Sequence, residues 1–398
     1  MTSTTSSTRM AERCARERGR GSAIVPGGEP VAAAHGRDAE QEVGKELAMS
    51  DNVVRAAAVQ AAPVFLDRDA TIEKAVALIA EAASAGARII AFPETWVPGY
   101  PAWIFGAAGW DDPAAKRVYA RLQANAVEVP SRATDVLCAA ARRAGACVVV
   151  GINERDVRFS TGTLYNSQLF ISAQGEILGV HRKLIPTHAE RILWGQGDGS
   201  GLHVFPTPFG RVGGLICWEH WMPLARFAMH AKGEQIHVAA WPDAPDTHHI
   251  ASRHYAFEGR CFVICAASYL RSTDLPRDFE LSNAMLSGAE DEGDDDEILP
   301  GGSGIIGPDG RWLAGPVKGR EEIVVADLDL GRIAEEQQAL DTAGHYNRPD
   351  VFQLTVDERV REQVAWLSDA ARGAHEPDAA PENGASTAAR GVSPRGRD

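Results

Sequence analysis

The sequence predicts an α/β fold whose sheets contain both parallel and antiparallel strands. Apolar, strand-like segments alternate with segments whose apolar residues recur at helical spacing along most of the 398 residues. Two strand-like segments, at 164–171 and 177–181, are separated only by a short stretch containing Gln174-Gly175, which indicates an antiparallel hairpin. Since strands joined through helices are usually parallel, mixed sheets are expected.

The first half of the chain carries local signals for each element. The expected elements, in order, are a strand at 53–62, a helix over 72–83, a strand at 89–92, aromatic-rich loops and helices, a helix at 131–144, a strand at 147–153 and the hairpin. Gly86 ends the first helix, because glycine adopts the left-handed conformation that closes helices. Pro93 ends the second strand, because proline cannot donate to a sheet ladder.

The second half continues the alternation. The expected elements are a strand at 211–216, a helix at 224–231, a strand at 236–241, a helix at 248–259, a strand at 262–267 and, beyond an acidic loop at 290–297, strands at 304–306 and 323–327. The segment 211–216 is rich in Gly, Val, Leu and Ile, as expected of a strand covered on both faces. Pro223 is tolerated in the first turn of the helix that follows it.

Composition limits the classes of function. The formal net charge is −14, and no basic run suggests nucleic-acid binding. No apolar run approaches the length of a membrane span, and the beginning of the chain lacks the apolar centre of a secretory signal. The six cysteines show no paired spacing and lie largely in apolar stretches. We therefore expect a cytoplasmic protein that binds neither nucleic acid nor membrane.

The two ends of the chain differ in composition from the middle. Residues 1–50 are rich in Ser, Thr, Arg, Gly and Glu without periodicity, which predicts a disordered extension. Met49 lies just before the first strand and is an alternative to Met1 as the natural start. Residues 371–398 consist largely of Ala, Gly, Pro, Ser and charged residues and are predicted to form a disordered tail. One domain is expected between them, over 51–370.

Three reactive side chains follow predicted strands. Glu94 comes after the strand at 89–92 among aromatic residues, where poor solvation raises a carboxyl pKa and makes a better general base. Lys183 comes after the hairpin, and Cys217 ends the strand at 211–216, where the coming helix would favour a thiolate. Singly, these are ordinary surface or packing residues. Together they place a carboxylate, an ammonium and a thiol at the strand ends where α/β sheets build sites.

The sequences around these residues resemble the nitrilase branch of the carbon–nitrogen hydrolase superfamily. The motifs that carry the resemblance are Phe-Pro-Glu-Thr at 92–95, His-Arg-Lys-Leu-Ile-Pro-Thr at 181–187, Cys-Trp-Glu-His-Trp-Met-Pro-Leu at 217–224, and further matches within 190–200, 301–303 and 344–350. The resemblance covers about 53–354. The Trp-Glu-His after the cysteine is similar to nitrilases rather than to the amidase or carbamoylase branches.

The resemblance implies a reaction and roles for four residues. A small-molecule nitrile would be hydrolysed to the carboxylic acid and ammonia, with Cys217 as nucleophile, Glu94 as base and Lys183 stabilising the nitrogen. Glu190 matches a further family glutamate that would hold Lys183 or assist the base. No metal or other cofactor is expected. Cys217→Ala, Glu94→Gln and Lys183→Met are expected to give folded, inert proteins.

The resemblance also implies an architecture and an assembly. It implies a four-layer α-β-β-α sandwich with two mixed sheets, which pairs into homodimers and often into larger spiral homo-oligomers. The backbone N–H of Trp218 would help to stabilise the nitrogen. Trp96 and Tyr100 are the candidates for lining the substrate pocket.

Other interpretations remain open from the sequence. An aliphatic amidase or a cyanide-hydrolysing enzyme is the alternative within the superfamily, and a filament-forming structural protein is the non-enzyme alternative. A Cys217–His220 dyad is the alternative of a cysteine hydrolase. The glycine-rich stretch at 195–201 lacks the Gly-Lys-Ser/Thr ending of a phosphate loop. Three histidines have spacing that matches no standard metal site: His248, His249 and His254.

Overall fold

The computed structural model describes residues 52–107, 109–286, 296–362 and 364. The extension predicted for 1–50, the choice between Met1 and Met49, and the tail predicted for 371–398 lie outside the described residues. Most of the acidic loop lies outside them as well. No helix in the described part of the chain is long and apolar enough to cross a membrane.

The first sheet is mixed, as predicted. Among the described residues it has six strands in the order β13-β1-β2-β3-β4-β5. These strands are β1 (Val53–Gln60), β2 (Ile89–Ala91), β3 (Cys147–Arg155), β4 (Leu164–Ile171), β5 (Ile177–Arg182) and β13 (Glu322–Asp329). β1, β2 and β3 are parallel, because the helices α2 (Arg68–Ser84) and α4 (Arg132–Ala144) return the chain between them. β4 and β5 form the predicted hairpin, and β13 pairs antiparallel with β1.

The second sheet is also mixed, with parallel strands at its centre. Within the described residues it has seven strands, six of them in the order β10-β11-β9-β8-β7-β6, with β12 paired to β11. These strands are β6 (Phe205–Thr207), β7 (Gly210–Ile216), β8 (Ile236–Ala240), β9 (Phe262–Ala266), β10 (Tyr269–Arg271), β11 (Glu297–Ile306) and β12 (Trp312–Lys318). β7, β8 and β9 are parallel, and α5 (Pro223–Ala231) and α6 (Asp246–Gly259) connect them.

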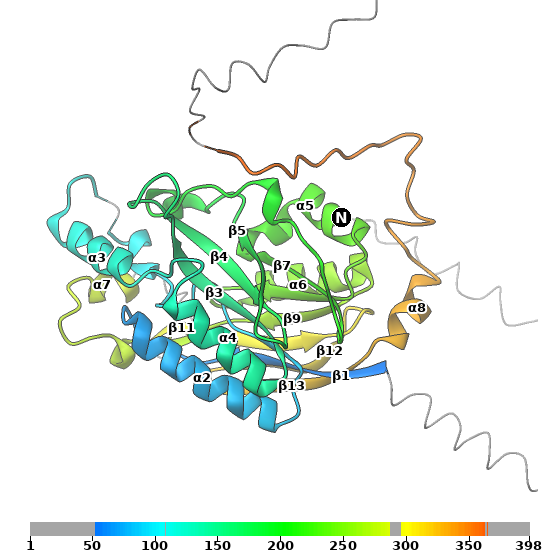
Figure 1. Cartoon of the computed structure of the whole chain (residues 1–398), viewed down its shortest axis with the longest axis horizontal. Coiled ribbons are helices and arrows are strands. Elements are labelled where there is room, and N and C mark those ends of the chain that lie inside the picture. Colours follow the sequence, from blue (N-terminus) through cyan, green and yellow to red (C-terminus); the bar gives the residue numbers. More distant parts are fainter. Residues whose placement is uncertain (1–51, 108, 287–295, 363, 365–398) are drawn as a thin grey trace, which may run out of the picture. The chain divides into compact units, whose positions relative to one another are not determined.

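Alternate residues of the central strands face different cores, and this alternation defines the layers. In β3, Val148 and Val150 pack with α2 and α4, while Val149 between them packs against the second sheet. In β9, Ile264 faces the first sheet and Val263 packs with α5 and α6. The layers therefore run α2 and α4, first sheet, second sheet, α5 and α6 (Figure 1). This is the predicted α-β-β-α sandwich.

Helix ends follow the expected local chemistry. The Asp67 side chain accepts a hydrogen bond from the N–H of Ala70 at the start of α2. Ser131 precedes α4, and its N–H donates a hydrogen bond to the Thr134 hydroxyl oxygen. Gly145 ends α4 with a φ of 58°, a conformation that favours glycine. The remaining helical elements are η2 (Ala102–Phe105), α3 (Pro113–Ala124), η3 (His188–Ile192), η4 (Gly199–Gly201), η5 (Cys217–Trp221), η6 (Ser272–Asp274), α7 (Ser282–Leu286) and α8 (Gly331–Gln337).

The strand predicted at 304–306 is longer in the structure, where β11 covers Glu297–Ile306. Its first half contains Leu-Pro-Gly-Gly, which reads as a turn in the sequence. Tertiary contacts override that signal, because β11 pairs with β10, β9 and β12. The short strands β6, β10 and β12 and the helix α8 have no sequence signal that we recognised.

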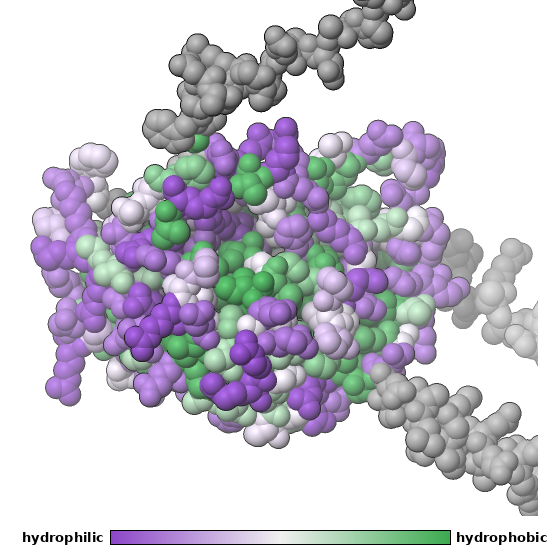
Figure 2. All heavy atoms as spheres, in the orientation of Figure 1, coloured by the Kyte–Doolittle hydropathy of each residue, from purple (hydrophilic) through white to green (hydrophobic). Residues whose placement is uncertain are grey.

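Polar side chains join the two sheets across their apolar interface. Gln60 of β1 accepts hydrogen bonds from the N–H groups of Gly302 and Ser303 in β11. Gln168 of β4 donates to the carbonyl of Val238 in β8. These buried hydrogen bonds connect the two sheets and fix how one lies on the other. On the face seen in Figure 2, hydrophilic residues surround a smaller hydrophobic area near the middle of the view.

Candidate active site

Glu94, Lys183 and Cys217 converge where the two sheets meet. Glu94 follows β2 and Lys183 follows β5, both of the first sheet, whereas Cys217 follows β7 of the second sheet. The Nζ atom of Lys183 donates to Glu94 Oε1 at 2.9 Å and to Glu190 Oε2 at 2.8 Å, and these three side chains are at most 1% exposed. Cys217 is buried and lines the same cavity as Glu190. The structure thus brings together Glu94, the segment that carries Lys183 and Glu190, and Cys217 from three separate parts of the sequence.

The turn that carries Glu94 lies directly on β3. The N–H of Glu94 donates to the carbonyl of Trp241, which follows β8. This turn therefore also contacts the second sheet. A Cβ atom at position 151 would lie 1.9 Å from the Pro93 carbonyl oxygen and 2.6 Å from the N–H nitrogen of Thr95. Only glycine allows this approach, so Gly151 permits the position of Glu94.

The turn that carries Cys217 is held by Glu219. The carboxylate accepts from the N–H of Ile216 at 2.6 Å and from the N–H of Leu184 at 2.8 Å, and it contacts His181 Nε2 at 2.8 Å. Burial raises the pKa of Glu219, but His181 and the two N–H groups more than offset this, so the pKa lies below its usual value. Glu219 therefore ties the cysteine turn to the segment that carries Lys183.

The ionisable groups shift one another. Burial raises the pKa of Glu94 to about 7, although Lys183 opposes the rise. Burial lowers the pKa of Lys183, but Cys217, Glu94 and Glu190 more than offset it, and the pKa lies well above its usual value. Burial raises the pKa of the Cys217 thiol well above its usual value, and Glu94 adds to the rise. The resting thiol is therefore neutral and must lose its proton before the sulfur can act as a nucleophile.

The sequence-based expectation of a thiolate favoured by the helix start is wrong for the resting site. η5 separates Cys217 from the start of α5 at Pro223, so the thiol does not lie at the end of a long helix. Burial beside Glu94 decides the protonation state instead. The expected rise in the pKa of Glu94 from poor solvation is present.

Two further polar residues donate hydrogen bonds to the carboxylates of the site. Asn166 of β4 donates to Glu94 Oε1 at 2.6 Å, and the Tyr100 hydroxyl donates to Glu190 Oε1 at 2.7 Å. Sequence reasoning missed Asn166. The signal was the polar run Asn-Ser-Gln within the otherwise apolar β4, whose residues are all buried.

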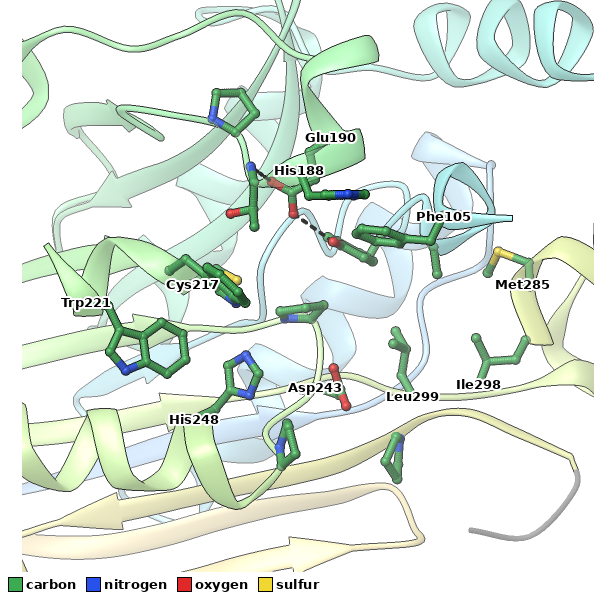
Figure 3. Close-up of a pocket in the computed structure, with 18 of the residues that line it drawn as sticks. Phe105, His188, Glu190, Cys217, Trp221, Asp243, His248, Met285, Ile298 and Leu299 are labelled. Atoms are coloured by element: carbon green, nitrogen blue, oxygen red, sulfur yellow. Dashed lines mark hydrogen bonds between the residues drawn. The ribbon is translucent and has the colours of Figure 1, made fainter. Parts of the chain in front are cut away.

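The thiol opens onto a cavity of about 1260 Å³. Figure 3 shows Cys217 facing the same space as Glu190, with Trp221 and His248 on one side and Phe105 and Leu299 on the other. A cavity of this size accommodates an organic molecule, and its wall is mainly aromatic and aliphatic.

Comparison with known proteins assigns the family. The sequence profile of the carbon-nitrogen hydrolase family matches residues 55–338. The chain belongs to this family. It is 42% identical over 338 residues to the bifunctional nitrilase/nitrile hydratase NIT4B of Nicotiana tabacum, covering 83% of this chain and 95% of that protein. It is 44% identical over 315 residues to an aliphatic nitrilase of Sinorhizobium fredii, covering 78% of this chain and 97% of that protein.

A solved structure shows the same fold. Nit3 of Saccharomyces cerevisiae, a member of branch 10 of the nitrilase superfamily, aligns with a TM-score of 0.58 and 19% identity, covering 75% of this chain and 97% of that chain. The predicted resemblance to nitrilases and the predicted sandwich are both confirmed. The profile match lies within the domain expected at 51–370, whose boundaries stay a prediction.

The candidate pocket residues of this carbon–nitrogen hydrolase lie in different places. Tyr100 and Trp218 line the cavity, and Trp218 is 54% exposed. Trp96 does not line it. Trp96 packs against Phe92 in the core beneath α2 and α4, and its Nε1 donates to the carbonyl of Ala61 at 2.7 Å. The sharp turn at Thr95, which has a φ of 43°, separates the directions of Glu94 and Trp96.

The histidines do not support the alternatives. The Nδ1 atom of His220 lies 2.6 Å from the backbone carbonyl oxygen of Cys217, so His220 is engaged with the backbone and forms no dyad with the sulfur. His248 lines the cavity, and burial lowers its pKa to about 4. His249 contacts the carbonyl of Gly302 at 2.8 Å. In the part of the chain that the structure describes, no group of three or more His, Cys, Asp or Glu residues is placed to hold a metal ion.

Proposed function

We propose that this carbon–nitrogen hydrolase converts an organic nitrile to the carboxylic acid and ammonia, with Cys217 as the nucleophile. The observation that carries the proposal is the buried Lys183 ammonium between Glu94 and Glu190, beside a thiol that opens onto the cavity. Relatives named as nitrilases at 42% and 44% identity support the same reaction.

The first half-reaction forms a covalent thioimidate. A nitrile carbon is a weak electrophile and needs a strong, soft nucleophile. Glu94 takes the thiol proton as the sulfur of Cys217 adds to the nitrile carbon. The nitrogen gains negative charge during this attack. The Lys183 ammonium and the backbone N–H of Trp218 are the donors that stabilise it. The proton that Glu94 took from the thiol then passes to this nitrogen, which completes the thioimidate and leaves Glu94 ionised.

The second half-reaction consumes two water molecules. Glu94 activates the first water, which adds to the thioimidate and gives a tetrahedral adduct. Loss of ammonia from the adduct leaves a thioester. A second water cleaves the thioester, which releases the carboxylic acid and restores the thiol. Glu190 acts as a positioning residue, since it holds Lys183 and is itself held by Tyr100.

A second product is favoured by one observation. The name of the tobacco relative includes nitrile hydratase as well as nitrilase activity. The tetrahedral adduct has two leaving groups, and expulsion of the thiolate instead of ammonia gives the amide. We therefore propose that some amide accompanies the acid.

The test is product analysis on a panel of aliphatic, arylacetic and aromatic nitriles, with the matching amides and cyanide alongside. Acid and ammonia from a nitrile are expected from the wild type, and Cys217→Ala should lose several orders of magnitude in kcat. Cys138→Ala is the matched control, because Cys138 is also buried but lies on α4, in the core between that helix and the first sheet. Turnover of amides alone, or of cyanide alone, would contradict the proposal and favour the other activities of the superfamily. No ammonia from any substrate would favour a structural role.

We further propose that the protein forms homodimers that assemble into larger spiral homo-oligomers. Exposed apolar side chains on α5 and α6 support this: Leu224 is 67%, Ile250 65% and Phe257 47% exposed. Light scattering coupled to gel filtration tests it, and a monomer at micromolar concentration would contradict it.

We place the protein in the cytoplasm. The support is that the described cysteines are free: Cys138, Cys147, Cys217, Cys261 and Cys265. Fractionation of the native host tests this placement.

A further inference from the structure

A chain of buried side chains leads from the backbone of Cys217 to Glu234. His220 Nδ1 lies 2.6 Å from the Cys217 carbonyl oxygen, and His220 Nε2 lies 3.0 Å from His237 Nε2. His237 Nδ1 lies 2.8 Å from Glu234 Oε1. The Tyr255 hydroxyl donates to Glu234 Oε2 at 2.6 Å. All four side chains are buried, and the reaction described above uses none of them.

The three links between Cys217 and Glu234 require three protons. A carbonyl oxygen only accepts, so His220 Nδ1 carries a proton, and Nε2 of the neutral ring accepts. His237 Nε2 then carries the second proton, and its Nδ1 accepts. The third proton lies between His237 Nδ1 and Glu234 Oε1, so it belongs either to a neutral Glu234 carboxyl or to a doubly protonated His237 ring. If Glu234 were ionised and both rings were neutral, two protons would serve three links, and one contact would set two acceptors against each other in the core.

The surroundings of Glu234 favour the neutral carboxyl. Burial lowers the pKa of His220 and of His237 well below the usual value, so neither ring carries an additional proton. Burial raises the pKa of Glu234 to about 8, although Tyr255 and His230 lower it. The titratable groups that face Glu234 or its partners are His230 on α5, His237 on β8, His248, Tyr255 and Glu258 on α6, Cys261 before β9, and the His181–Glu219 pair.

The carboxyl occupies space that only a glycine in the cysteine strand leaves open. A Cβ atom at position 213 of β7 would lie 2.2 Å from Glu234 Oε1. The absence of a side chain at Gly213 therefore lets the Glu234 carboxyl pack directly against β7, the strand that precedes Cys217.

The far end of this chain holds a strained peptide. Cys217 has a φ of 52°, a left-handed conformation that is unfavourable for a residue with a Cβ atom. The peptide that joins Cys217 to Trp218 is planar, so its C=O and N–H point in opposite directions. A hydrogen bond that fixes the carbonyl of Cys217 therefore also fixes the direction of the Trp218 N–H.

We propose that Glu234 is a positioning residue that, as a neutral proton donor, acts through His237 and His220 to hold the Cys217–Trp218 peptide in its reactive orientation. The inference rests on the proposed function, because it assigns the Trp218 N–H to stabilisation of the nitrile nitrogen. Ionisation of Glu234 removes the third proton, so one contact in the chain becomes repulsive and the hold on the peptide weakens. Turnover therefore falls on the alkaline side, as Glu234 ionises.

Three variants test the proposal through kcat and KM measured from about pH 6 to about pH 10 on a nitrile that the wild type hydrolyses. In Glu234→Gln, the amide can donate to His237 and accept from Tyr255, but it cannot ionise. Glu234→Met has a side chain of similar length without a donor. Tyr255→Phe keeps the ring that stacks on His237 and removes the hydroxyl that lowers the pKa of Glu234.

The expected results differ for each protein. Wild-type kcat falls with a midpoint near pH 8, where Glu234 ionises. Glu234→Met loses about 10²-fold in kcat with little change in KM, as expected of a misplaced reacting group. Glu234→Gln recovers most of that loss and shows no alkaline fall. In Tyr255→Phe the fall moves to higher pH. An alkaline fall that persists in Glu234→Gln, or equal losses in Glu234→Gln and Glu234→Met, would overturn the proposal.

A second readout does not depend on activity. The infrared difference spectrum between wild type and Glu234→Gln should contain the C=O stretch of a protonated carboxyl at about pH 7 and lose it at about pH 10. Absence of that band at neutral pH overturns the proposal even if Glu234→Met does not fold. Failure of the proposed function is recognised separately, because the wild type would then release no ammonia from any nitrile.

Discussion

Replacing Lys183 by methionine should destabilise the protein as well as inactivate it. The ammonium is buried between Glu94, at 2.9 Å, and Glu190, at 2.8 Å. Methionine fills a similar volume but leaves two carboxyl groups facing each other in the core without a cation. The sequence alone predicted a folded, inert variant, and the structure adds a loss of stability.

The magnitude follows from what remains buried. Removing one partner of a buried ion pair costs about 3–5 kcal/mol, because the other charge is left uncompensated. Two carboxyl groups share this ammonium, so we expect the upper part of that range at alkaline pH. For a protein of this size, the loss corresponds to a fall in Tm of roughly 10 °C.

The loss should shrink as the pH falls. Lys183 lowers the pKa of Glu94, which is about 7 in the folded protein, so removing the ammonium raises that pKa further. In the unfolded chain a glutamate has a pKa of about 4.3. Between these two values only the folded state holds the proton, so stability is lost as the pH rises through this window and regained as it falls. The deficit relative to wild type is therefore larger at about pH 8 than at about pH 5.5.

Thermal unfolding of wild type and Lys183→Met at these two pH values tests the reasoning. Lys74→Met is the matched control, because Lys74 pairs with Glu321 at 2.8 Å on the surface, where the two side chains are 30% and 46% exposed. The control should cost less than about 1 kcal/mol at either pH. A Tm for Lys183→Met equal to that of wild type at the higher pH, or a deficit that does not change with pH, would refute the prediction.

Three further predictions concern the site. Asn166→Leu should move the acid limb of kcat/KM to higher pH, because the Asn166 hydrogen bond lowers the pKa of Glu94; an unmoved limb contradicts this. Gly151→Ala should lower the free energy of unfolding by at least about 1–3 kcal/mol and reduce kcat, because the added Cβ would meet the Pro93 carbonyl oxygen. A Tm for Gly151→Ala equal to that of the wild type would contradict this prediction. Trp218→Ala should raise KM for aromatic nitriles about tenfold and affect kcat less, since the indole is lost and the backbone N–H remains. Steady-state kinetics in which Trp218→Ala lowers kcat more than it raises KM would contradict this prediction.

Local signals were sufficient to find the residues that converge. Glu94, Lys183 and Cys217 each follow a strand whose end is visible in the sequence, and strand ends of an α/β sheet meet at a common edge. The alternation of strands and helices, with one hairpin, likewise predicted an α/β fold with mixed sheets.

What could not be predicted depends on contacts between distant segments. The direction of Trp96 is set by a backbone turn that ordinary residues form without a sequence signature. The pairing of His237 with His220 and with Glu234 joins β8 to the cysteine turn and is visible only once the strands are assembled. The protonation of Cys217 also required the structure, because burial beside Glu94, rather than the helix start, determines it.

The division of the site between the two sheets has a practical consequence. Glu94 and Lys183 follow strands of one sheet and Cys217 follows a strand of the other. Sliding of one layer over the other by about 1 Å would therefore cost about 10²-fold in rate without exposing any core. Mild heating or a low concentration of denaturant should therefore abolish catalytic activity while the circular dichroism spectrum is still that of the native protein. Substitutions at Gln60 or Gln168, which bond one layer to the other, should lower turnover for the same reason.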